Sequence, residues 1–145
     1  KAPILTECLV HGHIPLMVSE YCVLGSFIGG LHTGVCSRPC ERGQYWLKDR
    51  KDEIFPIVTD QFCRMHILNA KELSMLPHVG RFSEIGVGRI RIEGKNMETR
   101  ELSEMTQLYR EILDLGDKHP MHIADTLTKR EHEHITRGHY FRGVL

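Results

Sequence analysis

Four of the five cysteines have the number and surroundings that a metal centre requires. Cys36 and Cys40 are separated by three residues in a glycine-rich stretch from Gly25 to Gly43, with Cys22 before it and Cys63 after it. Four thiolates meet the ligand demand of a [4Fe–4S] cluster, and loop backbone can offer N–H groups to the cluster sulfides. Zinc is the chemical alternative, although structural zinc sites usually use two close pairs and only one is present. The remaining alternative is a set of buried, small hydrophobic thiols.

Two histidine pairs are weaker candidates for a divalent metal site. His11 and His13 follow a predicted strand, whereas His132 and His134 alternate with glutamates in a pattern typical of a solvated helix face. The sequence contains no His-Glu-x-x-His zinc-protease motif, no Gly-x-Ser-x-Gly nucleophile elbow and no Gly-x-x-x-x-Gly-Lys phosphate loop. None of these familiar hydrolytic or phosphate-binding motifs is therefore available to assign a function.

Charged residues alternate with isoleucines between positions 89 and 93, and a glycine and a lysine follow. The charged members of this group are Arg89, Arg91, Glu93 and Lys95. At the C-terminal end of a barrel strand, an arginine can hold phosphate or carboxylate through its planar guanidinium. The alternative is a layer of salt bridges inside the barrel.

Composition bounds the class of protein. The chain has 145 residues, 41% of them hydrophobic and 26% charged, which suits one globular domain and is too apolar for a disordered chain. Nineteen basic residues balance nineteen acidic ones, which excludes a histone-like polyanion binder but not a local basic groove. There is no membrane-length apolar stretch and no signal peptide pattern, and an odd number of cysteines favours a reduced compartment. We therefore expect a cytoplasmic protein without membrane association, with Cys8 in the core.

The hydrophobic pattern predicts alternating strands and helices. Strands are expected at 6–10, 45–48, 54–58, 64–68 and 85–93, and helices at 70–78, 98–115 and 125–134. The strands at 45–48 and 54–58 are expected to form a hairpin around a charged turn, and His11-Gly-His13 is expected to end the first strand. The strand at 85–93 and the helix at 98–115 make a β–α unit, which indicates the α/β class.

Several segments match the motifs of a single family in the same order along the chain. The stretch from Glu7 to Gly12 resembles the opening of its signature, and Cys22 falls on the second signature cysteine, whereas Pro15 stands in place of the first. Further matching segments are 34–40, 66–73, 91–95 with 109–110, and 137–143. Together these segments resemble the collagenase-like peptidase family U-32.

The resemblance implies a TIM-like (β/α) barrel of which this chain, beginning inside an apolar run, is the C-terminal half, because a full barrel takes about 250 residues. Residues 1–116 would be the C-terminal part of the barrel domain, with a cluster-binding loop and hairpin insertion at about 22–63, and residues 117–145 a helical and extended tail of the same domain. The upstream half of the barrel, or further copies in a homo- or hetero-oligomer, would then be its partner.

The resemblance also implies iron–sulfur ligation by family cysteines. Cys22, Cys36 and Cys40 are then the ligands, and Cys63 is the candidate to replace the thiol lost at Pro15. Proteins of this family have been assigned oxygen-independent hydroxylation of an RNA base or of a quinone precursor, and also collagenase-like peptidase activity.

RNA modification is favoured over proteolysis, because no nucleophile–base pair with an orienting residue is evident and a cluster supplies electron transfer that side chains cannot. In this interpretation Arg89, Arg91 and Lys95 bind phosphate or an anionic co-substrate. Arg91 and Glu93 are the catalytic candidates, Glu93 orienting an arginine or transferring a proton. A collagenase-like endopeptidase and a non-catalytic, cluster-stabilised scaffold are the alternatives.

Overall fold

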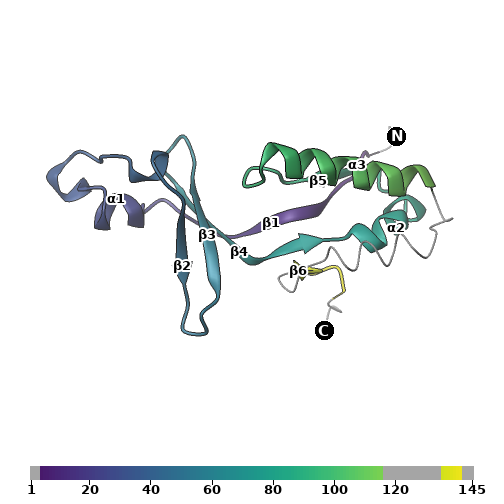
Figure 1. Cartoon of the computed structure of the whole chain (residues 1–145), viewed down its shortest axis with the longest axis horizontal. Helices are drawn as coiled ribbons and strands as arrows, with labels where there is room; N and C mark the ends of the chain where they lie inside the picture. The colour runs from purple at the N-terminus through teal and green to yellow at the C-terminus, as the bar shows by residue number, and fades with distance from the viewer. Residues whose placement is uncertain (1–3, 116–134, 142–145) are drawn as a thin grey trace. The chain divides into compact units, whose positions relative to one another are not determined.

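The structure, a computed structural model, describes residues 4–115 and 135–141 and divides the chain into two compact units (Figure 1). Unit 1 comprises Lys1–His13 and Lys71–Leu145, and unit 2 comprises Ile14–Ala70. The division falls within two strands, β1 (Glu7–Ser19) and β4 (Met65–Ser74), each of which contributes residues to both units.

Unit 1 combines parallel strand pairs with two helices. β5 (Arg89–Ile92) pairs with the first part of β1, and β6 (Ile135–Thr136) pairs with the end of β4. A 3₁₀ turn (Leu76–His78) leads into α2 (Val79–Glu84), which packs against α3 (Thr99–Leu115). The buried hydrophobic residues of this unit are Val10, Leu73, Met75, Leu76, Val79, Phe82, Tyr109 and Ile112. The apolar stripe predicted for the helix at 98–115 thus supplies part of a real core.

Unit 2 is built on an antiparallel hairpin. β2 (Tyr45–Lys48) pairs with β3 (Ile54–Thr59), which pairs in turn with the first residues of β4. The expected turn is confirmed, because the Asp49 carboxylate accepts hydrogen bonds from the backbone of Lys51 at 2.7 Å and of Glu53 at 3.0 Å. The remaining elements are α1 (Val23–Phe27) and 3₁₀ turns at Leu31–Thr33 and Pro39–Glu41. Buried residues Leu24, Ile57, Met65 and Ile67 form the core.

The strands form a six-stranded sheet in the hydrogen-bonded order β2-β3-β4-β1-β5, with β6 paired to β4. Parallel and antiparallel pairs occur together with helices, which confirms the α/β class. Over residues 4–115 and 135–141 the sheet is not seen to close into a barrel, so the TIM-like half barrel stays a prediction. No helix within the described ranges is both long enough and apolar enough to cross a membrane.

The helix expected at 70–78 is wrong. These residues instead continue β4 as far as Ser74 and then form the 3₁₀ turn Leu76–His78, with α2 following. Glu72 and Leu73 pair with Ile135 and Thr136, so a strand more than 60 residues away in the chain overrides the local helical spacing.

The predicted end of the first strand at His11-Gly-His13 is also wrong, because β1 runs on to Ser19. Gly12 adopts a φ of 112°, and the register with β5 shifts between Leu9 and His11. A glycine that bends a strand therefore resembled a strand terminus. The strand expected at 85–93 is shorter (Arg89–Ile92), the helix at 98–115 is confirmed as α3, and the helix predicted at 125–134 lies outside the described residues.

The segment around β6 is anchored to unit 1 by side chains from the Arg-Gly-His-Tyr-Phe stretch. The Arg137 guanidinium donates to the carbonyl of Ser74 at 2.7 Å, and the Tyr140 hydroxyl donates to the carbonyl of Leu9 at 2.6 Å. Burial, and then the charge and hydrogen bonding of the neighbouring Cys8 thiol, raise the pKa of Tyr140. Cys8 lies beside this tyrosine and is half-buried, not fully buried in the core as expected.

Candidate functional site

The first two cysteines of the predicted metal site receive backbone N–H groups at sulfur. Cys22 is the N-cap of α1, and its Sγ accepts a hydrogen bond from the backbone of Gly25 at 3.3 Å. The Sγ of Cys36 accepts one from the backbone of Arg38 at 3.4 Å. Backbone N–H groups directed at cysteine sulfur are also a common feature around iron–sulfur clusters.

Two glycines leave the space in which these sulfurs lie. A Cβ built on Gly25 would lie 3.4 Å from the Cys36 sulfur and 3.6 Å from the Cys22 sulfur, so the two thiols flank this residue. A Cβ on Gly29 would lie 2.8 Å from the Cys36 sulfur, closer than real side chains approach. Cys22 and Cys40 both pack against the core of unit 2. Three of the four predicted ligands thus share one part of this unit.

Cys63 lies in a separate turn. It is exposed, has a φ of 59°, and its backbone N–H donates to the carbonyl of Asp60 at 3.0 Å. Within the described part of the chain, no group of three or more cysteine, histidine or acidic side chains could hold a metal ion. The structure therefore does not gather the four thiols into one finished site, and ligation by Cys63 stays a prediction.

The turn that carries Cys63 is organised by one carboxylate. Oδ1 of Asp60 accepts from the backbone of Phe62 at 2.9 Å and of Arg64 at 3.0 Å, and Oδ2 lies 3.2 Å from Nε2 of His66. Desolvation acts to raise the pKa of Asp60, but the hydrogen bonds from His66, Arg64 and Phe62 outweigh it and hold that pKa well below its usual range. This turn fixes the backbone at Cys63.

The predicted alternation in β5 is confirmed. Arg89 and Arg91 are exposed, whereas Ile90 and Ile92 are half-buried. Nε of Arg91 lies 3.7 Å from Oε1 of Glu7, and both side chains are about half exposed to solvent. An exposed pair at this distance is weak, so an anionic ligand can compete for the guanidinium.

Glu93 and Lys95 follow β5 directly, and the backbone of β1 fixes the first of them. The Glu93 N–H donates to the carbonyl of His11 at 2.9 Å. A Cβ on Gly12 would lie only 2.4 Å from the Glu93 carbonyl oxygen, so this close approach requires glycine. Lys95 is exposed in the turn that leads to α3. The structure thus places the four charged candidates on one short segment of unit 1.

A polar cluster, formed by the buried His11 and Tyr109 and the half-buried Glu72, was missed by the sequence analysis. Nε2 of His11 lies 3.4 Å from Oε1 of Glu72, and its Nδ1 lies 3.3 Å from the Tyr109 hydroxyl. The Tyr109 hydroxyl also donates to the carbonyl of Val10 at 2.9 Å and lies 3.3 Å from the backbone nitrogen of Met75. The sequence analysis named His11 only as a weak metal candidate, and although all three residues lie in segments that match the family motifs, no local pattern joined them.

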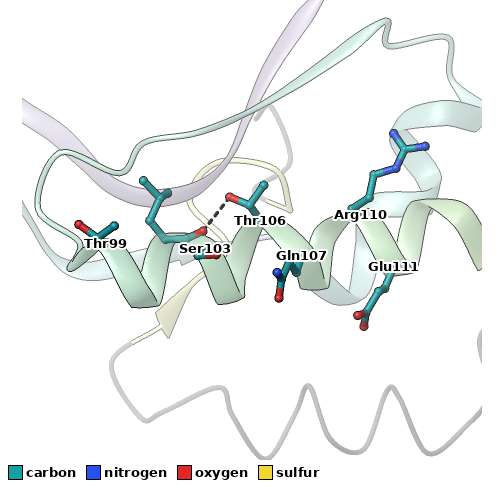
Figure 2. A pocket seen from close by; sticks show the side chains of 7 residues that line it. Thr99, Ser103, Thr106, Gln107, Arg110 and Glu111 are labelled. Atoms are coloured by element: carbon teal, nitrogen blue, oxygen red, sulfur yellow. Dashed lines mark hydrogen bonds between the residues drawn. The ribbon is translucent and has the colours of Figure 1, made fainter.

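A shallow open pocket lies along the outer face of α3 and is lined by side chains between Thr99 and Glu111 (Figure 2). All of its lining residues come from this one helix, and Arg110 pairs with Asp114 one turn further along. Thr106 hydrogen-bonds to the carbonyl of Leu102 at 2.7 Å, within the same helix. Among the described residues no second element contributes a chemical group, so this pocket is not the candidate site.

The sequence of this chain is similar to a known protein family and to a known protein. The model of peptidase family U32 matches residues 1–144. Over 116 residues the chain is 28% identical to a protein of Methanocaldococcus jannaschii named as an uncharacterized protease. The aligned region covers 79% of this chain but 28% of that protein. No solved structure matches the chain significantly. Because the family match covers nearly the whole sequence, the chain belongs to peptidase family U32.

Proposed function

We propose that this chain contributes the cluster-binding part of an iron–sulfur protein that hydroxylates an RNA base without oxygen. The observation that carries the proposal is the arrangement of Cys22 and Cys36, whose sulfurs flank Gly25 and accept backbone N–H groups. The chain spans 28% of the length of its relative from M. jannaschii, so the activity of a whole protein is itself part of the proposal.

The donor chemistry of unit 2 fits an iron–sulfur cluster. Cys22 and Cys36 would be ligands, Cys40 lies on the same core, and Cys63 is proposed as the fourth. Soft thiolates suit iron–sulfur clusters and zinc, and the glycines at 25 and 29 leave room for the sulfurs of Cys22 and Cys36. When bound, a cluster supplies electron transfer or activation of the substrate.

In unit 1, the charged side chains of β5 and of the turn after it are proposed to bind the substrate. Arg89, Arg91 and Lys95 are exposed and would hold RNA phosphates or an anionic co-substrate. Glu93 would orient an arginine or move a proton, since its backbone is fixed by His11 and Gly12. Because the ion pair of Arg91 with Glu7 is exposed and weak, Arg91 can bind an incoming anion in place of Glu7.

The cluster is tested by metal analysis after anaerobic purification. Single changes of Cys22, Cys36, Cys40 or Cys63 to Ala are each expected to lose iron, sulfide and visible absorbance. Cys8→Ala, the matched control in unit 1, is expected to keep all three. Full iron in Cys63→Ala would remove that residue from the ligand set, and stoichiometric zinc in the unaltered chain would refute an iron–sulfur cluster.

The RNA substrate is tested by nucleoside mass analysis of RNA from cells with and without the gene. Loss of a hydroxylated nucleoside supports the proposal. RNA binding should also weaken as salt rises, and Arg89→Ala or Arg91→Ala should each reduce the slope of log K against log salt by roughly 0.7 for single strands. Iron content should be unchanged in both variants, because these residues lie outside unit 2.

A peptidase is the second candidate, and the names of the family and of the relative favour it. The alternative predicts that the pure protein cleaves denatured collagen or casein and that cleavage continues after cluster loss. An unchanged nucleoside profile together with such cleavage would replace the RNA proposal. A chain with a cluster and neither reaction would favour the non-catalytic scaffold.

A further inference from the structure

We propose that the Glu72 carboxyl group is a proton-transferring catalytic group, and that His11 and Tyr109 are positioning residues behind it. The substrate group it serves is a nitrogen or oxygen atom that gains or loses a proton. The inference rests on the proposed function only for the nature of the substrate, a nucleobase. All three residues belong to unit 1.

The three side chains form a series of polar contacts from the interior of unit 1 to its surface. Tyr109 is 2% exposed, and the His11 side chain is 5% exposed, whereas the Glu72 side chain is 27% exposed. The neighbours of the latter two in β1 and β4, Val10 and Leu73, are completely or almost completely buried. Glu72 is therefore the one member of the series that a substrate in solvent can reach.

Both ring nitrogens of His11 face a polar side chain. Nδ1 lies 3.3 Å from the Tyr109 hydroxyl, which donates to the Val10 carbonyl at 2.9 Å and accepts from the Met75 N–H at 3.3 Å. On the other side of the ring, Nε2 lies 3.4 Å from Oε1 of Glu72. A carboxyl group and an imidazole in contact can each carry a proton, as an imidazolium beside a carboxylate or as a neutral imidazole beside a carboxylic acid.

A carboxyl group in contact with an imidazole is suitable for acid–base chemistry. In one direction, the O–H bond of the Glu72 carboxyl breaks, a bond forms between that proton and the substrate nitrogen or oxygen, and the carboxylate left behind is stabilised by His11. In the other direction, the carboxylate takes the proton from the same kind of atom. Only a proton moves, so the step needs no oxidant or reductant. A base held by a second group, itself oriented by a third, is the arrangement of many acid–base sites.

The structural alternative is a buried polar pair that only stabilises the fold. Two substitutions of Glu72 separate the two roles. Glu72→Gln keeps the size and hydrogen-bonding capacity of the side chain but cannot transfer a proton, whereas Glu72→Asp keeps the acid but is shorter. A structural role predicts that Gln is the better replacement. An acid–base role predicts that Asp restores activity and Gln does not.

The experiment measures the hydroxylated nucleoside in RNA from cells that express each variant at equal protein level. Glu72→Gln is expected to lower it about 100-fold or more, the usual contribution of a general acid or base, with Glu72→Asp between it and the unaltered chain. Tyr109→Phe should lower it by less than Glu72→Gln, because the contact of His11 with Glu72 remains. Ile112→Val, in the same helix as Tyr109, is the control for lost stability.

Iron content and the thermal midpoint are measured on every purified variant. The proposal is supported if three results are found together. Every variant keeps its iron content, the thermal midpoints of the Glu72 and Tyr109 variants are like that of Ile112→Val, and activity falls only in the Glu72 and Tyr109 variants. Equal activity in Glu72→Gln and Ile112→Val would overturn it, as would greater activity in Glu72→Gln than in Glu72→Asp.

The same variants are carried through the peptide-cleavage assay. If the unaltered chain cleaves peptides and leaves RNA unmodified, the RNA proposal fails. The acid–base role of Glu72 is then supported if Glu72→Asp cleaves peptides faster than Glu72→Gln, and overturned if it does not. If the unaltered chain performs neither reaction, the acid–base assignment is overturned as well.

Discussion

The two units of this chain assemble their chemical groups over very different distances along the sequence. In unit 2, Cys22, Cys36 and Cys40 come from one loop region, and the sulfur of Cys22 accepts a hydrogen bond from the backbone N–H of Gly25, three residues away. In unit 1, the contact of His11 with Tyr109 spans 98 residues. Local groups can be recognised from spacing, whereas distant groups meet only because strands and helices bring them together.

The two units also differ in which atoms lie next to their tightly packed glycines. In unit 1, glycine allows the backbone of Glu93 to pass next to β1, and in unit 2, glycines make room for sulfur. A methyl group added at Gly12 would lie 2.4 Å from a backbone carbonyl oxygen and at a positive φ, whereas one added at Gly29 would lie 2.8 Å from the Cys36 sulfur and from backbone atoms of Gly25. This difference predicts a larger loss of stability in unit 1.

The largest effect is expected for Gly12→Ala. The new Cβ would lie 2.4 Å from the Glu93 carbonyl oxygen, and the φ of 112° disfavours any other residue. Strain and overpacking together should cost about 3 kcal/mol or more in the free energy of unfolding. Gly86→Ala is the control, since its φ is 80° but no atom lies within 4 Å, and it should cost about 1–2 kcal/mol.

Urea denaturation measures both variants of this pair. The difference between them isolates the close approach of β1 and Glu93 from backbone strain alone. Equal losses would mean that Glu93 is not held by Gly12, and its proposed place beside the arginines of β5 would lose its structural support.

A smaller effect is expected for Gly29→Ala in unit 2. Its Cβ would lie 2.8 Å from the Cys36 sulfur and from backbone atoms of Gly25, so overpacking of about 1–3 kcal/mol should result. Iron bound after anaerobic reconstitution should fall, because the Cys36 sulfur must move. Gly43→Ala, whose Cβ would make only ordinary contacts with Tyr45, should retain both stability and iron. Iron retained in Gly29→Ala would argue against Cys36 as a ligand.

The same contrast explains what could be predicted from sequence. The hairpin at 45–48 and 54–58 and the helix at 98–115 carry local signals, a charged turn and a helical stripe, and the structure confirms both. The helix expected at 70–78 failed because the strand there is stabilised by pairing with β6, which no local pattern reveals. The same error concealed the role of Glu72, because a residue expected in a helix is not expected to lie beside His11 in a neighbouring strand.

Tyr109→Phe should have a moderate effect on unit 1. It removes the hydroxyl that joins His11 to the Val10 carbonyl, while the Met75 N–H keeps its own bond to that carbonyl at 2.9 Å. Loss of a buried hydrogen-bonding group should cost about 1–2 kcal/mol in the free energy of unfolding. Tyr45→Phe, at a half-buried tyrosine beside the core of unit 2, should change it by less than about 0.5 kcal/mol. Equal losses would show that the buried Tyr109 hydroxyl contributes no more to stability than the hydroxyl of Tyr45.

The smallest effect, and the one with a distinct pH dependence, concerns Asp60 in unit 2. Its pKa is lowered in the folded chain below the usual 3.8, so folding favours the carboxylate. The resulting stabilisation is complete above the unfolded pKa and is lost as the pH falls below about 4 towards the folded pKa. Asp60→Asn should therefore be less stable than the unaltered chain at pH 7, and the two should converge on acidification. Because Asp60 is partly exposed to solvent, the difference at pH 7 should be modest. Thermal midpoints measured from pH 7 to pH 2 test this, and a constant difference across that range would show that the carboxylate charge does not organise the turn at Cys63.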